Sequence, residues 1–256
     1  MPTDHRLRGR VAVITGAGTG IGVGIAQRLA EEGARIVLSA SNSIAGARSL
    51  ADEINNNGGS ALAVEADFRE PSTASLLVSS ATETFGGLDI LVNNAGFTLD
   101  KPFAETSLDE WTSLFNINVL AMIQTSHAAL GPMKERGRGR IINISSVHSA
   151  LHSSGHVIYG ATKGAVNAFS RALAIELAPK QITVNVIAPG AIYVERYDRD
   201  NRDLKAIQAA IPNKKLGLPN DVASAVAYLA SDEAHYVTGD VMFVDGGVTA
   251  NMGVND

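Results

Sequence analysis

A tyrosine and a lysine four residues apart, Tyr159 and Lys163, carry the clearest chemical signal in the sequence. This spacing puts both side chains on one face of a helix, and the helical pattern of apolar residues continues to about Leu177. A free phenol has a pKa of about 10, and a neighbouring ammonium lowers that pKa because it favours the phenolate. The pair therefore predicts a proton donor and acceptor that works near neutral pH. A surface tyrosine packed over a lysine is the alternative.

Two serines, Ser145 and Ser146, follow the apolar run 141–144, which predicts a strand. The chain between Ser146 and Tyr159 is long enough for a loop to bring both hydroxyls onto one substrate oxygen. Serines after a strand also commonly cap a helix or make a turn. A catalytic interpretation of Ser146 therefore depends on the tyrosine and the lysine.

Three glycines, Gly16, Gly20 and Gly22, form the pattern G-x-x-x-G-x-G after the apolar run 11–14. Because glycine has no Cβ atom, such a loop can turn tightly and approach a pyrophosphate, whose charge then faces the N-terminus of the next helix. The pattern predicts a dinucleotide-binding loop. Glycines at such a corner can also serve only to turn the chain.

Seven short apolar runs alternate with helical patterns along the chain. Such runs indicate parallel strands buried on both faces and joined by right-handed crossovers. The sequence thus predicts the α/β class, with a Rossmann-type, doubly wound, parallel seven-stranded sheet. The predicted strands are 11–14, 36–38, 62–64, 90–92, 141–144, 184–187 and 241–244. Because no linker or repeat divides the chain, residues 1–256 are predicted to form a single dinucleotide-binding and catalytic domain.

Two charged segments lie between the predicted elements. Segment 191–218 directly follows the sixth predicted strand, at the edge where open α/β sheets bind ligands. We predict that it is a substrate lid, with a solvated surface helix as the alternative. The basic run 134–140 joins a helix to a strand at the opposite edge and is interpreted as a solvated turn.

Composition argues against several classes of function. At 256 residues, with 45% hydrophobic and 18% charged residues, the chain can fold around its own core. It has no cysteine, which excludes disulfides and thiolate catalysis, and its net charge of −5 gives no reason to bind nucleic acid. The N-terminus does not resemble a signal peptide, and no apolar run approaches the length of a membrane span. We expect a cytoplasmic protein with neither nucleic acid nor membrane as a partner.

In combination, the motifs resemble the short-chain dehydrogenase/reductase family in its classical type. The resemblance covers the chain from Val11 to about Gly247, with the motifs in the family's order. Besides the residues above, it depends on Asn93-Asn94-Ala95-Gly96, on Asn118, on Pro189-Gly190 and on the final strand before Asp245. The layout is similar to that of 3-oxoacyl-[acyl-carrier-protein] reductases and of sugar or polyol dehydrogenases.

The resemblance implies a role for four side chains. Tyr159 would be the general acid/base at the carbonyl or alcohol oxygen, and Lys163 would hold the nicotinamide ribose and lower the pKa of Tyr159. Ser146 would hydrogen-bond the substrate oxygen and stabilise the charge that develops there. Asn118 would position a water that completes a proton relay.

The resemblance also implies the cofactor site and the assembly. Asn93 and Gly96 would lie beneath the adenine ribose, and Asp67 would contact the adenine amino group. The implied cofactor-binding residues are Gly16, Thr19, Gly20, Ile21, Gly22, Ser41, Asp67, Phe68, Asn94, Ala95, Gly96, Tyr159, Lys163, Pro189, Gly190 and Ile192. Since family members usually form dimers or tetramers, we expect a homo-oligomer, either a tetramer or a dimer.

Two positions depart from the family pattern. NAD-preferring members carry an acid at the end of the second strand, whereas this sequence has Ala40, which does not repel a 2′-phosphate. The basic residue usual in NADP enzymes is also missing, but Ser41 offers a hydrogen-bond donor and Arg48 follows within two helical turns. NADP(H) is therefore favoured over NAD(H). Val194 replaces a threonine that usually bonds the nicotinamide carboxamide, which leaves that contact to backbone groups such as those of Ile192.

Three histidines, His148, His152 and His156, recur every four residues before Tyr159. On a helix this spacing would suggest a metal site, but the serines and glycine between them indicate a loop, and the family's reaction needs no metal. We therefore expect no metal. The predicted substrate-pocket residues are Ser146, His148, Tyr159 and Tyr193. Such a polar pocket favours a hydroxylated substrate over a steroid-like one.

Two functional hypotheses follow. The first is an NAD(P)-dependent oxidoreductase that interconverts a carbonyl and a secondary alcohol by hydride transfer, with a 3-oxoacyl thioester or a sugar or polyol as substrate. The sequence does not choose between these substrates. The second hypothesis is a catalytically silent dinucleotide-binding regulator or scaffold. The intact set of four catalytic side chains favours the enzyme.

Overall fold

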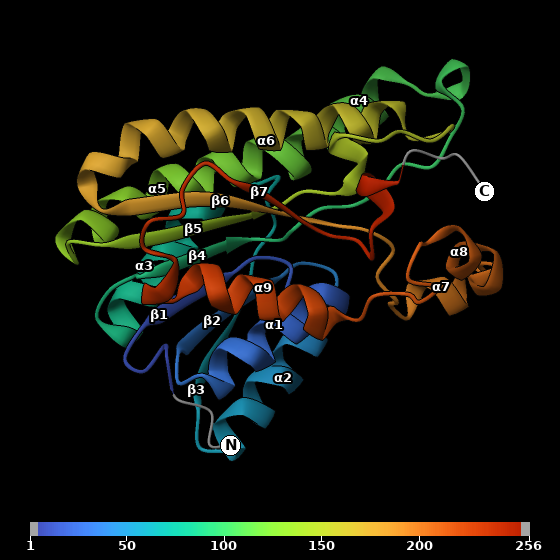
Figure 1. Ribbon diagram of the computed structural model, residues 1–256. Coiled ribbons are helices and arrows are strands. Elements are labelled where there is room, and N and C mark those ends of the chain that lie inside the picture. The colour runs from blue at the N-terminus through green and yellow to red at the C-terminus, as the bar shows by residue number, and fades with distance from the viewer. Residues whose placement is uncertain (1–4, 252–256) are drawn as a thin grey trace.

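The computed structural model describes residues 5–251, and seven strands within that range form one parallel sheet (Figure 1). The sheet order is β3-β2-β1-β4-β5-β6-β7. The strands are β1 (Val11–Ile14), β2 (Arg35–Ala40), β3 (Ser60–Glu65), β4 (Ile90–Asn93), β5 (Gly139–Ile144), β6 (Ile182–Pro189) and β7 (Val241–Val244). All seven contain a predicted apolar run, so the predicted doubly wound sheet is confirmed.

Helices cover both faces of the sheet (Figure 1). One face carries α1 (Gly20–Glu31), α2 (Ile44–Asn56) and α9 (Pro219–Ala230). The other carries α3 (Thr73–Phe85), α5 (Ala121–Glu135) and α6 (Val157–Leu177). The short helix α4 (Leu108–Phe115) runs into α5 through a π-turn (Asn116–Leu120). Among the helices of residues 5–251, none is both long and apolar enough to cross a membrane.

The strand β1 illustrates why the apolar runs become buried strands. Its side chains alternate between the two faces, and all four residues are buried. Val11 and Val13 pack with α3, α5 and α6, whereas Ala12 and Ile14 pack with α1 and α9. Burying each of the larger side chains stabilises the fold by about 1.5–3 kcal/mol. A strand covered on both sides has no polar face, which explains the continuous apolar sequence.

The strand order reverses between β1 and β4, which are neighbours in the sheet. In doubly wound sheets the ligand crevice opens at such a point, outside the carboxyl ends of the strands. Two further helices, α7 (Arg196–Arg199) and α8 (Leu204–Ala210), stand beyond those ends and away from the sheet (Figure 1). The fold therefore brings the loops after β1, β4, β5 and β6 to one edge.

The interpretation of the basic run 134–140 as a solvated turn is wrong for Arg140, which lies in β5 and is 8% exposed, whereas Arg136 and Arg138 stay at the surface and form ion pairs. Arg136 and Arg138 pair with the carboxylate of Asp89 at 3.0 and 2.9 Å. Asp89 is only 1% exposed, so its charge needs such partners. Pairing of β4 with β5 brings these residues together, because Asp89 directly precedes β4 and the basic run leads into β5.

Candidate active site

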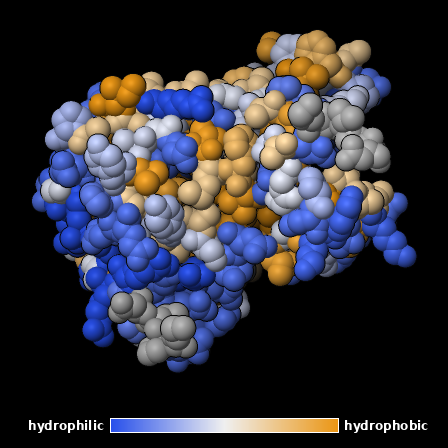
Figure 2. All heavy atoms as spheres, viewed as in Figure 1, coloured by the Kyte–Doolittle hydropathy of each residue, from blue (hydrophilic) through white to orange (hydrophobic). Residues whose placement is uncertain are grey.

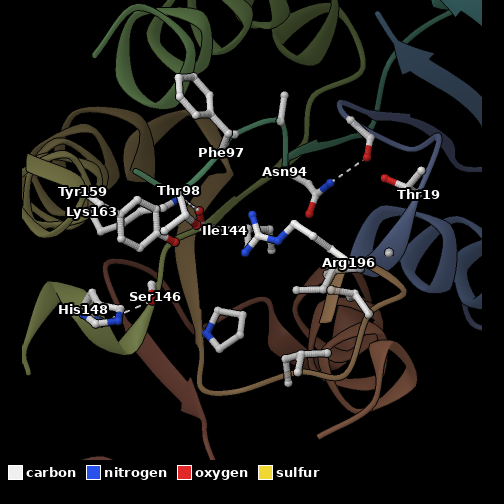
Figure 3. A pocket seen from close by; sticks show the side chains of 18 of the residues that line it. Thr19, Asn94, Phe97, Thr98, Ile144, Ser146, His148, Tyr159, Lys163 and Arg196 are labelled. Carbon is white, nitrogen blue, oxygen red and sulfur yellow. Dashed lines mark hydrogen bonds between the residues drawn. The ribbon is translucent and has the colours of Figure 1, made fainter. Parts of the chain in front are cut away.

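A cavity of about 1290 Å³ opens at the carboxyl ends of the strands (Figure 3). It combines the glycine loop, the tyrosine–lysine pair and the loop after β6 in one space. The predicted residues that line it are Gly16, Thr19, Gly20, Ile21, Ser41, Asp67, Phe68, Asn94, Ala95, Gly96, Ser146, His148, Tyr159, Lys163, Pro189, Gly190 and Ile192. Four other predicted residues are not part of the lining, namely Gly22, Asn93, Asn118 and Tyr193.

The glycine loop is packed too closely to accept side chains. Gly16 has a φ of +67°, and a Cβ atom there would lie 2.9 Å from the Cα of Ala95. A Cβ on Gly22 would lie 2.3 Å from the carbonyl oxygen of Gly16. Gly22 is therefore needed beneath the loop, where α1 meets the sheet, and Gly16 is needed in the loop itself. The resulting backbone cradle at the N-terminus of α1 fits a pyrophosphate.

Thr15 and Asn94 join the glycine loop to the loop after β4. The hydroxyl oxygen of Thr15 accepts hydrogen bonds from the backbone N–H groups of Asn94 (2.9 Å) and Ala95 (3.0 Å). The carboxamide of Asn94 donates to the carbonyl oxygens of Thr15 and Gly16, both at 3.0 Å. Sequence reasoning gave Thr15 no role, although it precedes the first glycine of the motif. The two loops thus form one rigid wall at the point where the strand order reverses.

Tyr159 lies in the first turn of α6, opposite Thr19 and Asn94 across the cavity (Figure 3). Burial raises the pKa of its phenol, and hydrogen bonding with Ser146 and Thr98 opposes that rise. The hydroxyl oxygen of Ser146 also accepts a hydrogen bond of 3.2 Å from the backbone N–H of His148. The hydroxyls of Tyr159 and Ser146 therefore meet in one place, where a substrate oxygen can contact both.

Lys163 lies one turn further along α6 and is buried, although it lines the cavity. Its Nζ donates to the carbonyl oxygen of Ile144 at 2.9 Å and lies 5.6 Å from the centre of the Tyr159 ring. Burial lowers the pKa of Lys163 to about 8. The expected lowering of the Tyr159 pKa by this ammonium is not seen, because burial dominates the pKa of the phenol and Lys163 bonds a carbonyl instead.

Replacing Lys163 by methionine is expected to stabilise the fold at pH 7 by about 1–3 kcal/mol, since it removes a buried charge. The pKa of Lys163 falls from 10.5 to about 8 in the folded chain. Below pH 8 the Lys163 amine is protonated in both the folded and the unfolded chain, so the folded chain bears the full cost of burying the charge. Between pH 8 and 10.5 the amine is protonated only in the unfolded chain. The stability of the unaltered protein therefore rises with pH across that window. Urea unfolding at pH 7 and pH 10 should show the gap between variant and parent shrinking, and a gap independent of pH would contradict the assignment.

Asn118 lies in the π-turn and is only 3% exposed. Its carboxamide oxygen accepts from the N–H of Phe97, and its nitrogen donates to the Phe97 carbonyl, both at 3.0 Å. The same nitrogen donates to Thr162 of α6 at 3.2 Å. Asn118 thus ties the loop after β4 to the helix that carries Tyr159 and Lys163.

The three histidines line the cavity wall beside Tyr159. The rings of His148 and His156 stack with centroids 4.6 Å apart, and the His148 ring meets the Tyr159 ring edge-on at 5.7 Å. Burial lowers the pKa of His148, and its Nδ1 is buried without a hydrogen-bond partner. Among residues 5–251, the structure contains no group of three acidic or histidine side chains arranged to hold a metal ion.

Two residues lie elsewhere than the sequence predicts. Tyr193 is held outside the lining, because its N–H donates to the Gly217 carbonyl at 2.8 Å and its hydroxyl donates to Asp198 at 2.5 Å. Tyr197, one turn further on, lines the cavity in its place. Asn93 is also absent from the lining, since its carboxamide is buried in hydrogen bonds with Thr125, Ser126 and Asn143.

The cavity wall beyond the carboxyl ends of β2 and β3 contains a positively charged side chain, Arg69, that the sequence did not predict there. Arg69 lines it and binds the carboxylate of Asp67, which lowers the pKa of that carboxyl to about 2. Arg48 instead pairs with Glu65 at 3.4 Å and is not part of the lining. Ala40, at the end of β2, leaves this wall without the acid of NAD-preferring relatives.

Comparisons with known proteins show the family of the chain. Residues 16–249 match the family described as enoyl-(acyl carrier protein) reductase. The chain is 39% identical to a 3-oxoacyl-[acyl-carrier-protein] reductase of Vibrio cholerae, over 94% of this chain and 98% of that protein. It is also 39% identical to glucose 1-dehydrogenase 2 of Bacillus subtilis, over 95% of this chain and 96% of that protein. A solved structure, a blue fluorescent protein from a metagenomic library in complex with NADPH, superposes with a TM-score of 0.89 at 36% identity and covers 95% of this chain and 99% of its own.

The chain belongs to the short-chain dehydrogenase/reductase family. It is an oxidoreductase that acts on alcohol and carbonyl groups.

Proposed function

We propose that the protein transfers hydride between NADP(H) and a ketone or secondary alcohol, with Tyr159 as the general acid/base. The observation that carries the proposal is the meeting of Tyr159 and Ser146 in the same cavity as the glycine loop. A bound nicotinamide would supply or accept the hydride. The candidate substrates are a 3-oxoacyl thioester, as the name of the Vibrio relative suggests, and a sugar or polyol, as the Bacillus relative suggests.

Each catalytic side chain has a distinct task in this proposal. Tyr159 donates its phenolic proton to the carbonyl oxygen during reduction and removes the hydroxyl proton during oxidation. Ser146 donates a hydrogen bond to the same oxygen and so stabilises its negative charge. Lys163 holds the nicotinamide ribose, and its ammonium offsets the charge of the phenolate that Tyr159 becomes. Asn118 positions both the loop at Phe97 and a water of the relay.

The residues present fit a dinucleotide with a 2′-phosphate. The backbone cradle at Gly16 and Gly20 would hold the pyrophosphate at the N-terminus of α1. Ala40 brings no charge to the adenine end, and Ser41 and Arg69 offer donors there. The solved relative that holds NADPH supports the same preference. The remaining predicted cofactor contacts all line the cavity except Gly22, which supports the loop from below.

We further propose that residues 1–256 act as a single domain in which segment 191–218 is a lid. Support comes from the base of the segment, where Ile192 forms a β-bridge with Gly217 and the Gly217 N–H donates to the Ala191 carbonyl at 3.0 Å. The helices α7 and α8 between these two anchors line the catalytic end of the cavity. Because both ends of segment 191–218 are held by hydrogen bonds, the helices between them can move together over the substrate.

We also propose a cytoplasmic homo-oligomer, a tetramer or a dimer. The edge strand β7 supports an interface, since Phe243 is 37% exposed and apolar surface surrounds the strand (Figure 2). A monomer by light scattering would contradict this assembly.

Cofactor titration followed by substrate screening tests the proposed function. Binding of NADPH and NADH is followed by nicotinamide fluorescence at matched ionic strength, and the NADPH complex is then screened with 3-oxoacyl thioesters and oxidised sugars. We expect NADPH to bind at least about tenfold more tightly, which corresponds to about 1.4 kcal/mol, and to be consumed with at least one carbonyl class. Failure of both cofactors to bind, or binding without any turnover, would count against the proposal.

A further inference from the structure

Arg196, on α7, reaches into the catalytic end of the cavity. It lines the cavity, and in Figure 3 its guanidinium lies between Tyr159 and Asn94 and points toward the side that carries Tyr159. Its charge opposes the rise that burial causes in the pKa of Tyr159, and it adds to the lowering of the Asp100 pKa, which is due mainly to the hydrogen bond from Arg202. A permanent positive charge therefore faces the space in which the reacting carbonyl must sit.

The guanidinium of Arg196 has only a long ion pair with Asp200, and its side chain is 41% exposed. Its Nε is buried without a hydrogen-bond partner, and the nearest carboxylate oxygen, in Asp200, lies 3.6 Å away. Arg202, in contrast, has a partner, because it donates a hydrogen bond of 2.8 Å to the carboxylate of Asp100. Buried N–H groups nearly always have an acceptor, and a guanidinium pairs best with the two oxygens of a carboxylate or phosphate. The arrangement of Arg196 thus suits an anion that enters with a ligand.

Two ligands could supply that anion, the substrate and the cofactor. The pyrophosphate of a dinucleotide already has a place at the N-terminus of α1, beside Thr19 and Gly20. The charge of Arg196 contributes to the pKa of Tyr159, Tyr197 and Asp100, which lie at the catalytic end of the cavity. Three cavity-lining histidines make the same end polar. These observations favour the substrate.

We propose that the substrate is an anionic oxo or hydroxy compound, whose carboxylate or phosphate lies close to the reacting carbon and is bound by Arg196. The proposal rests on the function proposed above and narrows its substrate class. Neutral sugars and uncharged thioesters bring no anion to the Arg196 Nε, which lacks a hydrogen-bond partner, whereas an oxo acid or the phosphate ester of a hydroxyketone supplies one. Arg196 then orients the carbonyl toward Tyr159 and Ser146 in addition to binding the substrate.

Matched pairs of probes that differ in one anionic group test the proposal. The pairs are acetoacetate against ethyl acetoacetate, and dihydroxyacetone phosphate against dihydroxyacetone, each reduced with NADPH. In the unaltered protein we expect kcat/KM for the anionic member of at least one pair to exceed that of the neutral member by tenfold or more. Arg196→Met should lower the anionic value at least tenfold more than the neutral value, which also changes because a charge near Tyr159 is lost, and should leave the Kd of NADPH within about twofold. The control is Lys205→Met, which removes one positive charge from an exposed side chain of α8. It should change none of these values.

The possible failures are distinguishable. Two results would overturn the inference and leave the proposed function intact. The first is a higher kcat/KM for the neutral member of both pairs, and the second is an equal loss of kcat/KM on both members in Arg196→Met. A raised Kd for NADPH in Arg196→Met would assign the guanidinium to the cofactor phosphates instead. If the parent protein reduces none of the four probes, the melting temperature of its NADPH complex with each anion decides: a rise that Arg196→Met abolishes supports the inference, and no rise overturns it. Absence of turnover with every carbonyl tried would contradict the proposed function itself.

Discussion

Replacing Tyr159 by phenylalanine is expected to lower kcat on the order of 10³-fold while the Kd for NADPH changes by less than about twofold. The change removes one oxygen from the floor of the cavity and preserves the ring that packs against His148. Without the phenol there is no proton for the carbonyl oxygen, and general acid–base groups typically contribute about 10²–10⁴-fold to rate. Steady-state reduction of the best carbonyl probe and fluorescence titration of NADPH measure the two quantities.

The matched control is Tyr228→Phe, which removes the same atom from α9, outside the cavity lining. It should leave both quantities unchanged. Turnover retained in Tyr159→Phe would show that another group moves the proton, and it would remove the main argument against a regulator or scaffold that only binds the dinucleotide.

Introducing an acid at the end of β2 should reverse the cofactor preference. Ala40 is 4% exposed, and its neighbour Ser41 lines the cavity at the adenine end. In Ala40→Asp the carboxylate would repel a 2′-phosphate and accept hydrogen bonds from the ribose hydroxyls of NADH. We expect the ratio of the NADPH and NADH dissociation constants to change on the order of 100-fold, as measured by nicotinamide fluorescence at fixed salt.

Ala40→Asn separates charge from size in this experiment. The asparagine has nearly the shape of the aspartate, so any loss due to packing appears in both variants. Selective loss of NADPH only in Ala40→Asp supports a phosphate site beside Ser41. Equal loss of both cofactors in the two variants would mean that crowding, not charge, dominates, and an unchanged ratio would place the 2′-phosphate elsewhere.

The strands and the glycine loop could be predicted because their signals are local. A strand buried on both faces must be apolar throughout, as in β1, and a loop that approaches a helix N-terminus needs glycine at Gly16 and Gly22. The tyrosine–lysine spacing likewise places both groups on one face of α6. These features depend on the geometry of a few consecutive residues.

The features that sequence reasoning missed depend on residues far apart in the chain. Arg136 and Arg138 are paired only because β5 lies beside β4, where Asp89 is buried. The pKa of Lys163 depends on how deeply its ammonium is buried, which no local pattern encodes. The position of Arg196 in the cavity depends on where α7 lies relative to the sheet. Pairing, burial and lid placement are tertiary properties, so they became visible only in the folded chain.

The π-turn that holds Asn118 has a consequence for how the chain can vary in length. A π-turn contains one residue more than an α-helical turn, and its wider turn accommodates that residue without rotating the helix that follows. Leu114 is buried before the turn, and Met122 and Met133 are buried after it. Deleting one residue from Asn116–Leu120 would close the π-turn into an ordinary α-helix, which keeps the buried face of α5 against the sheet but moves the carboxamide of Asn118 away from Phe97. Insertions and deletions should therefore be tolerated at the exposed turn around Gly58 but excluded from this segment, whose residue number is as constrained as the identity of Asn118.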